Sequence, residues 1–145
     1  MSPTPRLTRA VPVIFVADVQ TSAEFFRDTL GFSIDFLDGD PPFYGAVSRD
    51  GACLHIKFVH QPVLAVGAED NSDFINAFVE VDNLDALFTE HIAAGATFHQ
   101  TLTTESWGGR DFVVGDPDGN AICFASRVAS CDAVAGRRHG RDLLD

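Results

Sequence analysis

The amino-acid sequence predicts an α+β protein made of two copies of one unit, each consisting of a strand, a helix and three further strands. Residues 18–31 begin with Asp, end with Gly and carry apolar side chains at helical spacing, and residues 82–95 repeat this pattern over the same length. An Asp-Gly pair then precedes a strand in each copy, at residues 50–51 and 118–119. The copies are offset by about 64 to 68 residues, and the matched spacing favours a duplicated module over a chance likeness of two halves.

The first copy follows an N-terminal arm, residues 1–8, which is polar and contains proline. We expect a strand at residues 11–16. Pro12 cannot donate to a β-ladder, so this strand should lie at a sheet edge or where the arm departs. Asp18 should begin the helix and Gly31 should cap its end. Further strands are predicted at residues 32–36, 43–48 and 52–58, separated by a turn-rich break at 38–42 and a turn at 50–51.

The second copy begins after residues 60–73, a stretch without periodicity that we interpret as a linker. A strand is expected at residues 74–81, and Asp82 should open a helix that Gly95 caps. Near the end, two short apolar runs flank Asp-Pro-Asp-Gly-Asn at residues 116–120, which predicts a hairpin. The chain thus divides into a duplicated domain at 1–127, with module one at about 7–59 and module two at about 74–127, and a tail at 128–145 that we expect to be flexible.

Composition and charge limit the classes of partner. The length of 145 residues suits one domain, and 46% hydrophobic with 21% charged residues is ordinary for a globular protein. The formal charge of −11 argues against nucleic acids and anionic membrane surfaces and favours cationic small molecules. No apolar run reaches the length of a membrane span. The three cysteines lack metal-site spacing and no signal segment precedes them, so they predict reduced thiols in a cytoplasmic protein.

The stretch from Trp107 to Asn120 carries the most specific motif. It places the only Trp beside two glycines and Arg110, so an aromatic ring and a charge can lie at a pocket mouth, although a packed hairpin with an incidental Trp is the alternative. The pattern W-G-x-R-x-F-x-V-x-D-P-x-G-N resembles the hairpin of bleomycin-resistance proteins in the vicinal oxygen chelate superfamily, which includes glyoxalase I and ring-cleaving dioxygenases.

The first copy extends this resemblance with A-V-P-V at residues 10–13 and E-F-F-R-D-T-L-G-F-S-I-D-F at residues 24–36. The likeness covers roughly residues 7–127. It implies two βαβββ modules that form a curved mixed sheet around a cleft, with the helices on the outer face.

Metal binding can be tested against the sequence. Strand alternation puts Cys53, His55 and Lys57 on the cleft face of their strand, and the repeat makes Cys123 equivalent to His55. The resemblance implies that superfamily metalloenzymes use His, Glu or Gln at four positions, which here hold Val11, His55, Ile75 and Cys123. Two hydrocarbon side chains cannot ligate, and one His plus one Cys fall short of the three protein ligands of a catalytic divalent site. We therefore expect no metal, no cofactor and no catalytic residue, and we favour a protein without enzyme activity.

His55 and Cys123 each need an interpretation of their own. A lone imidazole on a cleft face can hydrogen-bond a ligand or act as a general base. More often it is satisfied by a neighbour or by water, and we favour that structural role. Cys123 has no evident cationic partner or helix start nearby, which predicts an inert buried thiol.

A binding surface remains. The resemblance implies an acidic homodimer that holds a cationic, partly planar drug between aromatic rings in clefts between subunits. It places cleft aromatics at Phe36, Phe43 and Trp107, and it matches Pro12 to the hinge of an N-terminal arm exchanged between partners. Tyr44 adjoins this set in the sequence. The expected ligand-binding residues are Phe36, Phe43, Tyr44, His55, Lys57, Trp107 and Arg110.

The leading hypothesis is sequestration of a bulky cationic aromatic antibiotic, or a related small molecule, without turnover. Lys57 stands where the resistance proteins have a small polar residue and adds a positive charge, so the ligand need not be bleomycin itself. Two alternatives stay open: a metal-dependent glyoxalase- or dioxygenase-type enzyme of the same superfamily, and a protein that holds a biosynthetic intermediate.

Overall fold

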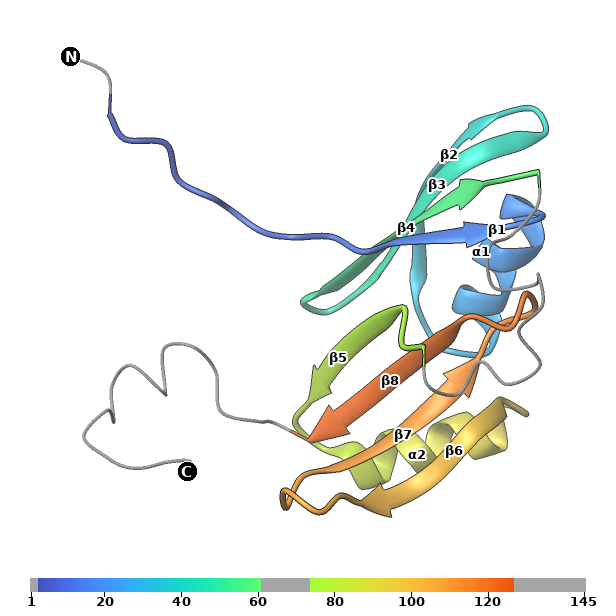
Figure 1. Ribbon diagram of the computed structural model, residues 1–145. Helices are drawn as coiled ribbons and strands as arrows, with labels where there is room; N and C mark the ends of the chain where they lie inside the picture. Colours follow the sequence, from blue (N-terminus) through green and yellow to red (C-terminus); the bar gives the residue numbers. More distant parts are fainter. Residues whose placement is uncertain (1–2, 61–73, 127–145) are drawn as a thin grey trace.

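Two modules of the same topology make up the computed structural model, which describes residues 3–60 and 74–126 (Figure 1). The first contains β1 (Val13–Val16), α1 (Val19–Asp28), β2 (Ser33–Gly39), β3 (Pro42–Arg49) and β4 (Ala52–Phe58). The second contains β5 (Ala77–Val81), α2 (Leu84–Ala93), β6 (Thr97–Thr104), β7 (Arg110–Gly115) and β8 (Ala121–Ser126). Each forms a four-stranded mixed sheet, in the orders β1-β4-β3-β2 and β5-β8-β7-β6. The expected α+β fold of two βαβββ modules is confirmed; the expected linker and tail lie almost wholly outside the described residues.

Both helices begin at a polar side chain that accepts a hydrogen bond from a free backbone N–H. Asp18 is the cap of α1, as expected, and its carboxylate accepts at 3.0 Å. In the second module the cap is Asn83, which accepts at 3.3 Å, so α2 begins one residue later than an Asp82 cap would have it. After the helices, Gly31 and Gly95 adopt φ angles of 78° and 80°, the left-handed conformation that lets the chain turn back.

The strand boundaries differ from expectation beside proline and at β5, which starts at Ala77 rather than at residue 74. β1 starts at Val13 rather than at residue 11, because Pro12 has no N–H to donate, and only its carbonyl joins the ladder by accepting from His55 N at 2.9 Å. β1 is an edge strand, as Pro12 predicted. β2 and β3 pair up to Gly39 and Pro42, so the break expected at residues 38–42 shrinks to a hairpin turn.

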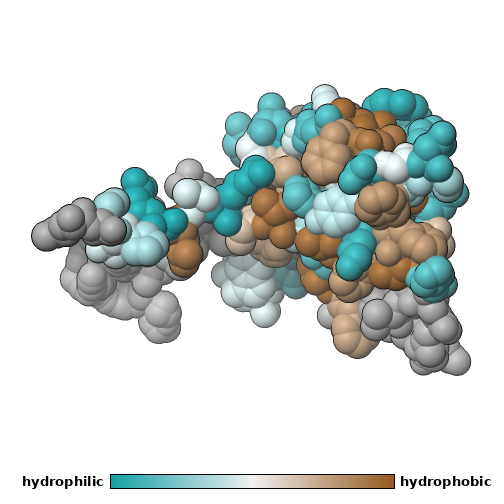
Figure 2. Space-filling model, turned by 90° about the horizontal axis from the view of Figure 1, so that it is seen from above, coloured by the Kyte–Doolittle hydropathy of each residue, from teal (hydrophilic) through white to brown (hydrophobic). Residues whose placement is uncertain are grey.

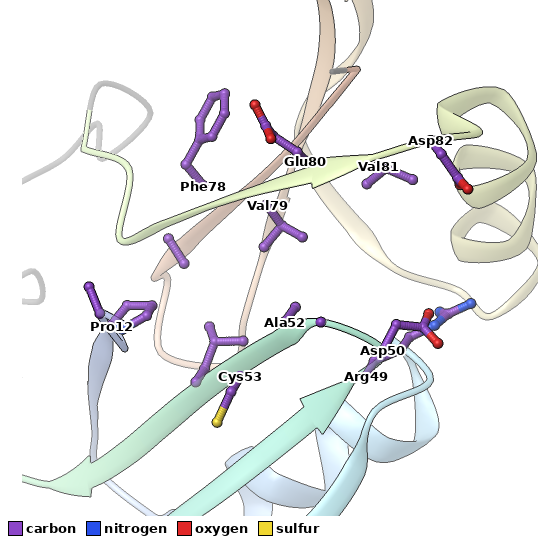
Figure 3. A pocket seen from close by; sticks show the side chains of 14 residues that line it. Pro12, Arg49, Asp50, Ala52, Cys53, Phe78, Val79, Glu80, Val81 and Asp82 are labelled. Atoms are coloured by element: carbon purple, nitrogen blue, oxygen red, sulfur yellow. The ribbon is translucent and has the colours of Figure 1, made fainter. Parts of the chain in front are cut away.

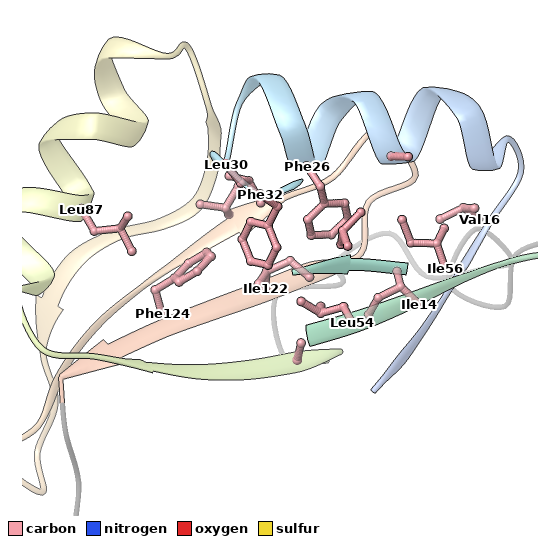
Figure 4. Close-up of a cluster of buried hydrophobic side chains, with 14 of the residues drawn as sticks. Ile14, Val16, Phe26, Leu30, Phe32, Leu54, Ile56, Leu87, Ile122 and Phe124 are labelled. Carbon is pink, nitrogen blue, oxygen red and sulfur yellow. The ribbon is translucent and has the colours of Figure 1, made fainter. Parts of the chain in front are cut away.

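One hydrophobic core spans both modules. The helix-covered faces of the two sheets and the apolar faces of the helices contribute to a single cluster (Figure 4). Phe26 of α1, Leu30 just after α1 and Ile122 of β8 are completely buried in it, and Phe124 of β8 is 2% exposed. Since the two modules share their helix-covered faces, the opposite face of each sheet, called here the helix-free face, carries no helix.

An ion pair ties the modules together on one side of this core. The Arg49 guanidinium, at the end of β3, donates to the Glu90 carboxylate on α2 at 2.7 and 3.1 Å and to the Leu30 carbonyl at 2.9 Å. The hydrogen bonds from Arg49 lower the pKa of Glu90. Arg49 therefore satisfies the backbone carbonyl of Leu30, in the turn that follows α1, while it also holds α2.

The hairpin turn of residues 116–120 ties the modules together a second time. Asp116 accepts from the backbone N–H groups of Asp118 and Asn120 at 2.9 and 2.7 Å, which shapes the turn. Asp118 then accepts from Ala17 N at 3.2 Å, and the Asn120 amide donates to the Phe15 carbonyl at 3.0 Å. The motif that was expected to form a hairpin thus also anchors the first module.

The N-terminal arm stands off from the body. Residues 3–10 have no regular structure and are exposed, including Leu7 at 100% (Figures 1 and 2). Neither helix in the described ranges is long and apolar enough to span a membrane.

Candidate ligand-binding site

Three rings gather on the helix-free face of the first module: Phe36 of β2, Tyr44 of β3 and His55 of β4. Strand register explains the cluster, because Ala46 lies between Phe36 and His55 in one cross-strand row and its methyl group leaves room above it. Phe36 and Tyr44 lie within 11° of parallel, with ring centroids 6.5 Å apart. The His55 ring stands at 78° to Phe36 and 82° to Tyr44, at centroid distances of 6.1 and 5.4 Å. We call these three residues the aromatic trio.

A hydrogen bond holds the trio together. The Tyr44 hydroxyl lies 2.9 Å from His55 Nδ1. His55 is thus satisfied at one nitrogen by a neighbour, as the structural interpretation expected. Phe36 remains 45% exposed, so its ring presents an open aromatic surface.

The rest of this face combines apolar side chains with charges of both signs, and the exposed Asp38 of β2 lies opposite Tyr44 in the ladder. Val13 and Phe15 of the edge strand β1 are each 40% exposed and lie in the same cross-strand rows as His55 and Lys57. Lys57 is exposed, and its ammonium forms no ion pair with any residue in the described ranges. The first module therefore brings Phe36, Tyr44, His55 and Lys57 together.

The three other expected ligand-binding residues lie elsewhere in the single chain. Phe43 alternates with Tyr44 along β3, so it points to the helix-covered side, where its ring meets Gly39 and is 54% exposed. Trp107 sits on the loop between β6 and β7, 58% exposed, with its ring folded over Gly109. Arg110 donates to Asp85 of α2 at 2.8 and 3.1 Å, on the helix-covered side.

The helix-free face of the second module is acidic where the first is aromatic. The Gln100 amide donates to Asp111 at 2.7 Å and to Glu105 at 3.4 Å, bridging two carboxylates. The hydrogen bond and charge of Asp111 raise the pKa of Glu105. Cys123, the equivalent of His55, lies 4.0 Å from Asp111; burial first and the Asp111 charge second raise the pKa of its thiol to about 12. The expectation of a buried, unreactive thiol agrees with this setting.

Sequence reasoning passed over this acidic group. Asp111 alternates with the core residue Phe112, so the period of two would have placed it on the helix-free face next to Cys123. The contributions of Gln100 and Glu105 had no comparable signal, because β6 pairs with β7 through two irregularities in register.

A cavity of about 720 Å³ lies between the modules and does not include the aromatic trio. Its walls come from β5, from the start of β4 with the turn before it, and from the base of the arm at Pro12 (Figure 3). Val79 and Ala52 face each other across it, and Asp50 and Asp82 lie at its rim. In a single subunit the trio thus lies on an open surface, whereas the cavity is a separate feature beside the edge strand β5.

The family model of the Glyoxalase/Bleomycin resistance protein/Dioxygenase superfamily matches residues 7–124. The chain belongs to this superfamily. A bleomycin resistance protein of Geobacillus stearothermophilus is 25% identical over 137 residues, which cover 86% of this chain and 100% of that protein. A bleomycin-binding protein from bleomycin-producing Streptomyces verticillus, crystallised with copper(II)-bleomycin, is 31% identical, with a TM-score of 0.70 over 86% of this chain and 100% of that chain. TioX from Micromonospora sp. ML1 is 19% identical, covers 83% of this chain and 99% of that chain with a TM-score of 0.67, and shows the fold alone.

Superfamily membership makes the metal positions worth locating. Val11 precedes β1 and Ile75 precedes β5. His55 Nδ1 is hydrogen-bonded to the Tyr44 hydroxyl, and Cys123 lies beside the Asp111 carboxylate. Within residues 3–60 and 74–126, no three His, Cys, Asp or Glu side chains are grouped so that they could hold a metal ion. The described part of the chain presents an aromatic surface and an acidic surface instead.

Proposed function

We propose that this superfamily member binds a bulky, cationic, aromatic antibiotic or a related small molecule in clefts between two identical subunits and sequesters it without turnover in the cytoplasm. The observation that carries the proposal is the aromatic trio, with Phe36 45% exposed on a sheet face that carries no helix. A flat cation stacks on such rings, and each aromatic pair contributes roughly 0.5–1.5 kcal/mol beyond area burial. The bleomycin-binding relative at 31% identity supports this class of ligand.

The acidic group of the second module supplies the complementary charge. Asp111 and Glu105 lie on a helix-free face, as the trio does, but on the other module. We propose that a two-fold dimer sets the trio of one subunit opposite the carboxylates of its partner. A cationic ligand between them would stack on the aromatic trio and neutralise the partner's carboxylates. The net charge of −11 on each chain also favours a cation.

The edge strands and the arm support the dimer. Val13 and Phe15 on β1 and Phe78 on β5 are 40 to 52% exposed, and both strands lie at the edges of their sheets. The arm carries the fully exposed Leu7 between Arg6 and Arg9. We propose that, hinged at Pro12, it crosses to the partner subunit.

The cavity beside β5 suits this arm by shape and charge. Its wall includes Leu54 and Val79, and its rim carries Asp50 and Asp82 together with Arg49, whose charge is paired with Glu90. A leucine flanked by two arginines complements an apolar floor with an acidic rim, and an extended segment matches an unpaired strand edge.

Replacing Phe36 or Trp107 with Ala should weaken the binding of metal-free bleomycin by roughly 1–3 kcal/mol, or about 5- to 150-fold in Kd. Phe36 would lose its stacking surface, and Trp107 would lose a ring that we place over the partner's cleft. Isothermal titration calorimetry measures both. Ile92→Ala is the matched control, because Ile92 is 53% exposed on α2, away from the helix-free faces, and its loss should leave the Kd unchanged.

The same experiment separates sequestration from enzyme activity. Mass spectrometry of the ligand recovered after long incubation should show the unaltered compound at one molecule per cleft. A chemically changed ligand, or wild-type affinity in both the Phe36 and Trp107 variants, would contradict the proposal.

Replacing Leu7 with Asp should weaken the dimer. Each arm would lose the burial of a leucine side chain, roughly 2 kcal/mol, and gain a negative charge facing Asp50 and Asp82. Sedimentation velocity should show a rise in the dimer dissociation constant of at least about tenfold. Gln20→Asp, which adds the same charge on the exposed surface of α1, should leave the dimer intact. A wild-type chain that sediments as a monomer at micromolar concentration would refute the dimer and the clefts with it.

A further inference from the structure

The hydrogen-bonded pair of Tyr44 and His55 has one hydrogen left over. Their contact of 2.9 Å joins the Tyr44 hydroxyl to His55 Nδ1. A neutral imidazole carries one N–H and a phenol carries one O–H, and the bond between them uses one of these two hydrogens. If Tyr44 donates, the Nε2–H of His55 remains; if His55 donates, the Tyr44 O–H remains. In both tautomers the pair keeps one donor for a third group.

The remaining donor lies beside the stacking surface. The His55 side chain makes no other hydrogen bond with the described residues, and its Nε2 is not among their buried atoms without a partner. The imidazole stands at 78° to the Phe36 ring, while Tyr44 is nearly parallel to that ring. A flat ligand stacked on Phe36 lies parallel to it and brings its edge toward the pair. Ring nitrogens and carbonyl oxygens accept hydrogen bonds at that edge.

The second module has no such pair. At the position equivalent to His55 it carries Cys123, a buried thiol that faces Asp111. The neutral donor is therefore specific to the aromatic half of the site. It can satisfy a ligand acceptor there without adding a charge, unlike Lys57 two residues along β4.

We infer that the Tyr44–His55 pair donates a hydrogen bond to an acceptor at the edge of the ligand. The site therefore selects nitrogen- or carbonyl-bearing heteroaromatic rings over hydrocarbon rings of the same shape. This inference rests on the proposed function, since it needs a ring stacked on Phe36. A hydrocarbon ring would cover the leftover donor without satisfying it, and an unsatisfied donor removed from water is costly. Tyr44 acts as a positioning residue that keeps the imidazole upright beside Phe36.

Quinoline and naphthalene test this inference, because they share size and shape and differ by one in-plane ring nitrogen. Their affinities for the full-length protein can be measured by NMR titration at pH 8, with ¹⁵N-labelled histidine. The ratio of the quinoline affinity to the naphthalene affinity removes the contribution of stacking that both probes share. Comparing this ratio between the wild type and the double variant Tyr44→Phe/His55→Phe removes the difference in hydration of the two probes. The ratio should shift toward naphthalene by about threefold to tenfold in the double variant, whereas each single variant keeps one N–H or O–H donor and should shift it less. Naphthalene affinity itself should stay the same in Tyr44→Phe.

The ring nitrogen resonances give a readout that a purely structural role would not move. Quinoline should shift the signals of the His55 ring nitrogens in the wild type, and naphthalene should not. An unchanged affinity ratio in the double variant, or equal shifts with both probes, overturns the inference. If naphthalene binding still depends on Phe36 in that case, the proposed stacking surface stands and only the acceptor selection fails. If neither probe binds the wild type, the stacking surface and the inference fail together.

Discussion

Replacing Phe124 with Ala should lower the free energy of unfolding by about 3–5 kcal/mol. Phe124 is 2% exposed and lies in the core that both modules share. Its ring contacts Phe112 at a centroid distance of 5.4 Å and His91 at 5.0 Å, so its removal leaves a cavity lined by aromatic rings. Urea unfolding followed by circular dichroism measures the change as a lower transition midpoint at an unchanged slope.

Phe43→Ala makes the same chemical change at an exposed position and serves as the control. Phe43 is 54% exposed at the end of a hairpin, so its loss should alter stability by no more than about 0.5 kcal/mol. Equal losses in the two variants would mean that the shared core does not stabilise the fold as described.

Neutral His91 should contribute up to about 3 kcal/mol to the free energy of unfolding, a contribution that is lost in acid, and replacing His91 with Leu should remove this pH dependence. His91 is completely buried on α2 against Phe112 and Phe124. Burial lowers its pKa from 6.5 to about 4; Arg49 adds to the lowering, while Glu90 and the Leu30 carbonyl oppose it. The unfolded chain therefore binds the proton more tightly. The contribution of neutral His91 is complete above pH 6.5 and is lost as the pH falls toward 4.

Asp116 titrates in the same window with the opposite sign. Burial raises its pKa from 3.8 to about 6, against the hydrogen bonds from Asn120 and Asp118. Here the folded state binds the proton more tightly, so the contribution is complete below pH 3.8 and is lost as the pH rises through 6. The two effects offset each other in the wild type between pH 6.5 and 4.

Urea unfolding at several pH values between 7 and 4.5 isolates His91. The stability of His91→Leu relative to wild type should increase as the pH falls, because every other group, including Asp116, cancels in the difference. Parallel pH profiles for the two proteins would show that His91 is not held neutral by burial.

The sequence predicted β4 and the cap of α1 well because their signals are local. Leu54 and Ile56 alternate with Cys53, His55 and Lys57, and period two is enough to assign faces. The contact between Tyr44 and His55 was also within reach. The turn at residues 50–51 sets Arg49 opposite Ala52, and counting back places Tyr44 diagonally from His55.

Other features depend on how the elements dock and leave no local trace. Asp82 and Asn83 are adjacent and both residue types are favourable helix N-caps, so the sequence alone does not show that Asn83 is the cap of α2. The sequence does not indicate that Arg110 pairs with Asp85, because this ion pair forms only once α2 packs on its sheet. Trp107 lies on the loop between β6 and β7 of the second module, whereas the aromatic trio lies on the first, and no local pattern in the sequence indicates this separation.

The tie between the turn at residues 116–120 and the β1–α1 junction also bears on the order of folding. Its two hydrogen bonds join residues 101 and 105 positions apart, so they close nearly the whole described chain into one loop. During synthesis the first module leaves the ribosome before Asn120 has been added. The part of its apolar surface that packs against the second module therefore stays exposed until that module has been made. Such long-range closure slows folding and leaves the half-made chain prone to association. Premature termination between the modules would release a fragment with half of the shared core exposed.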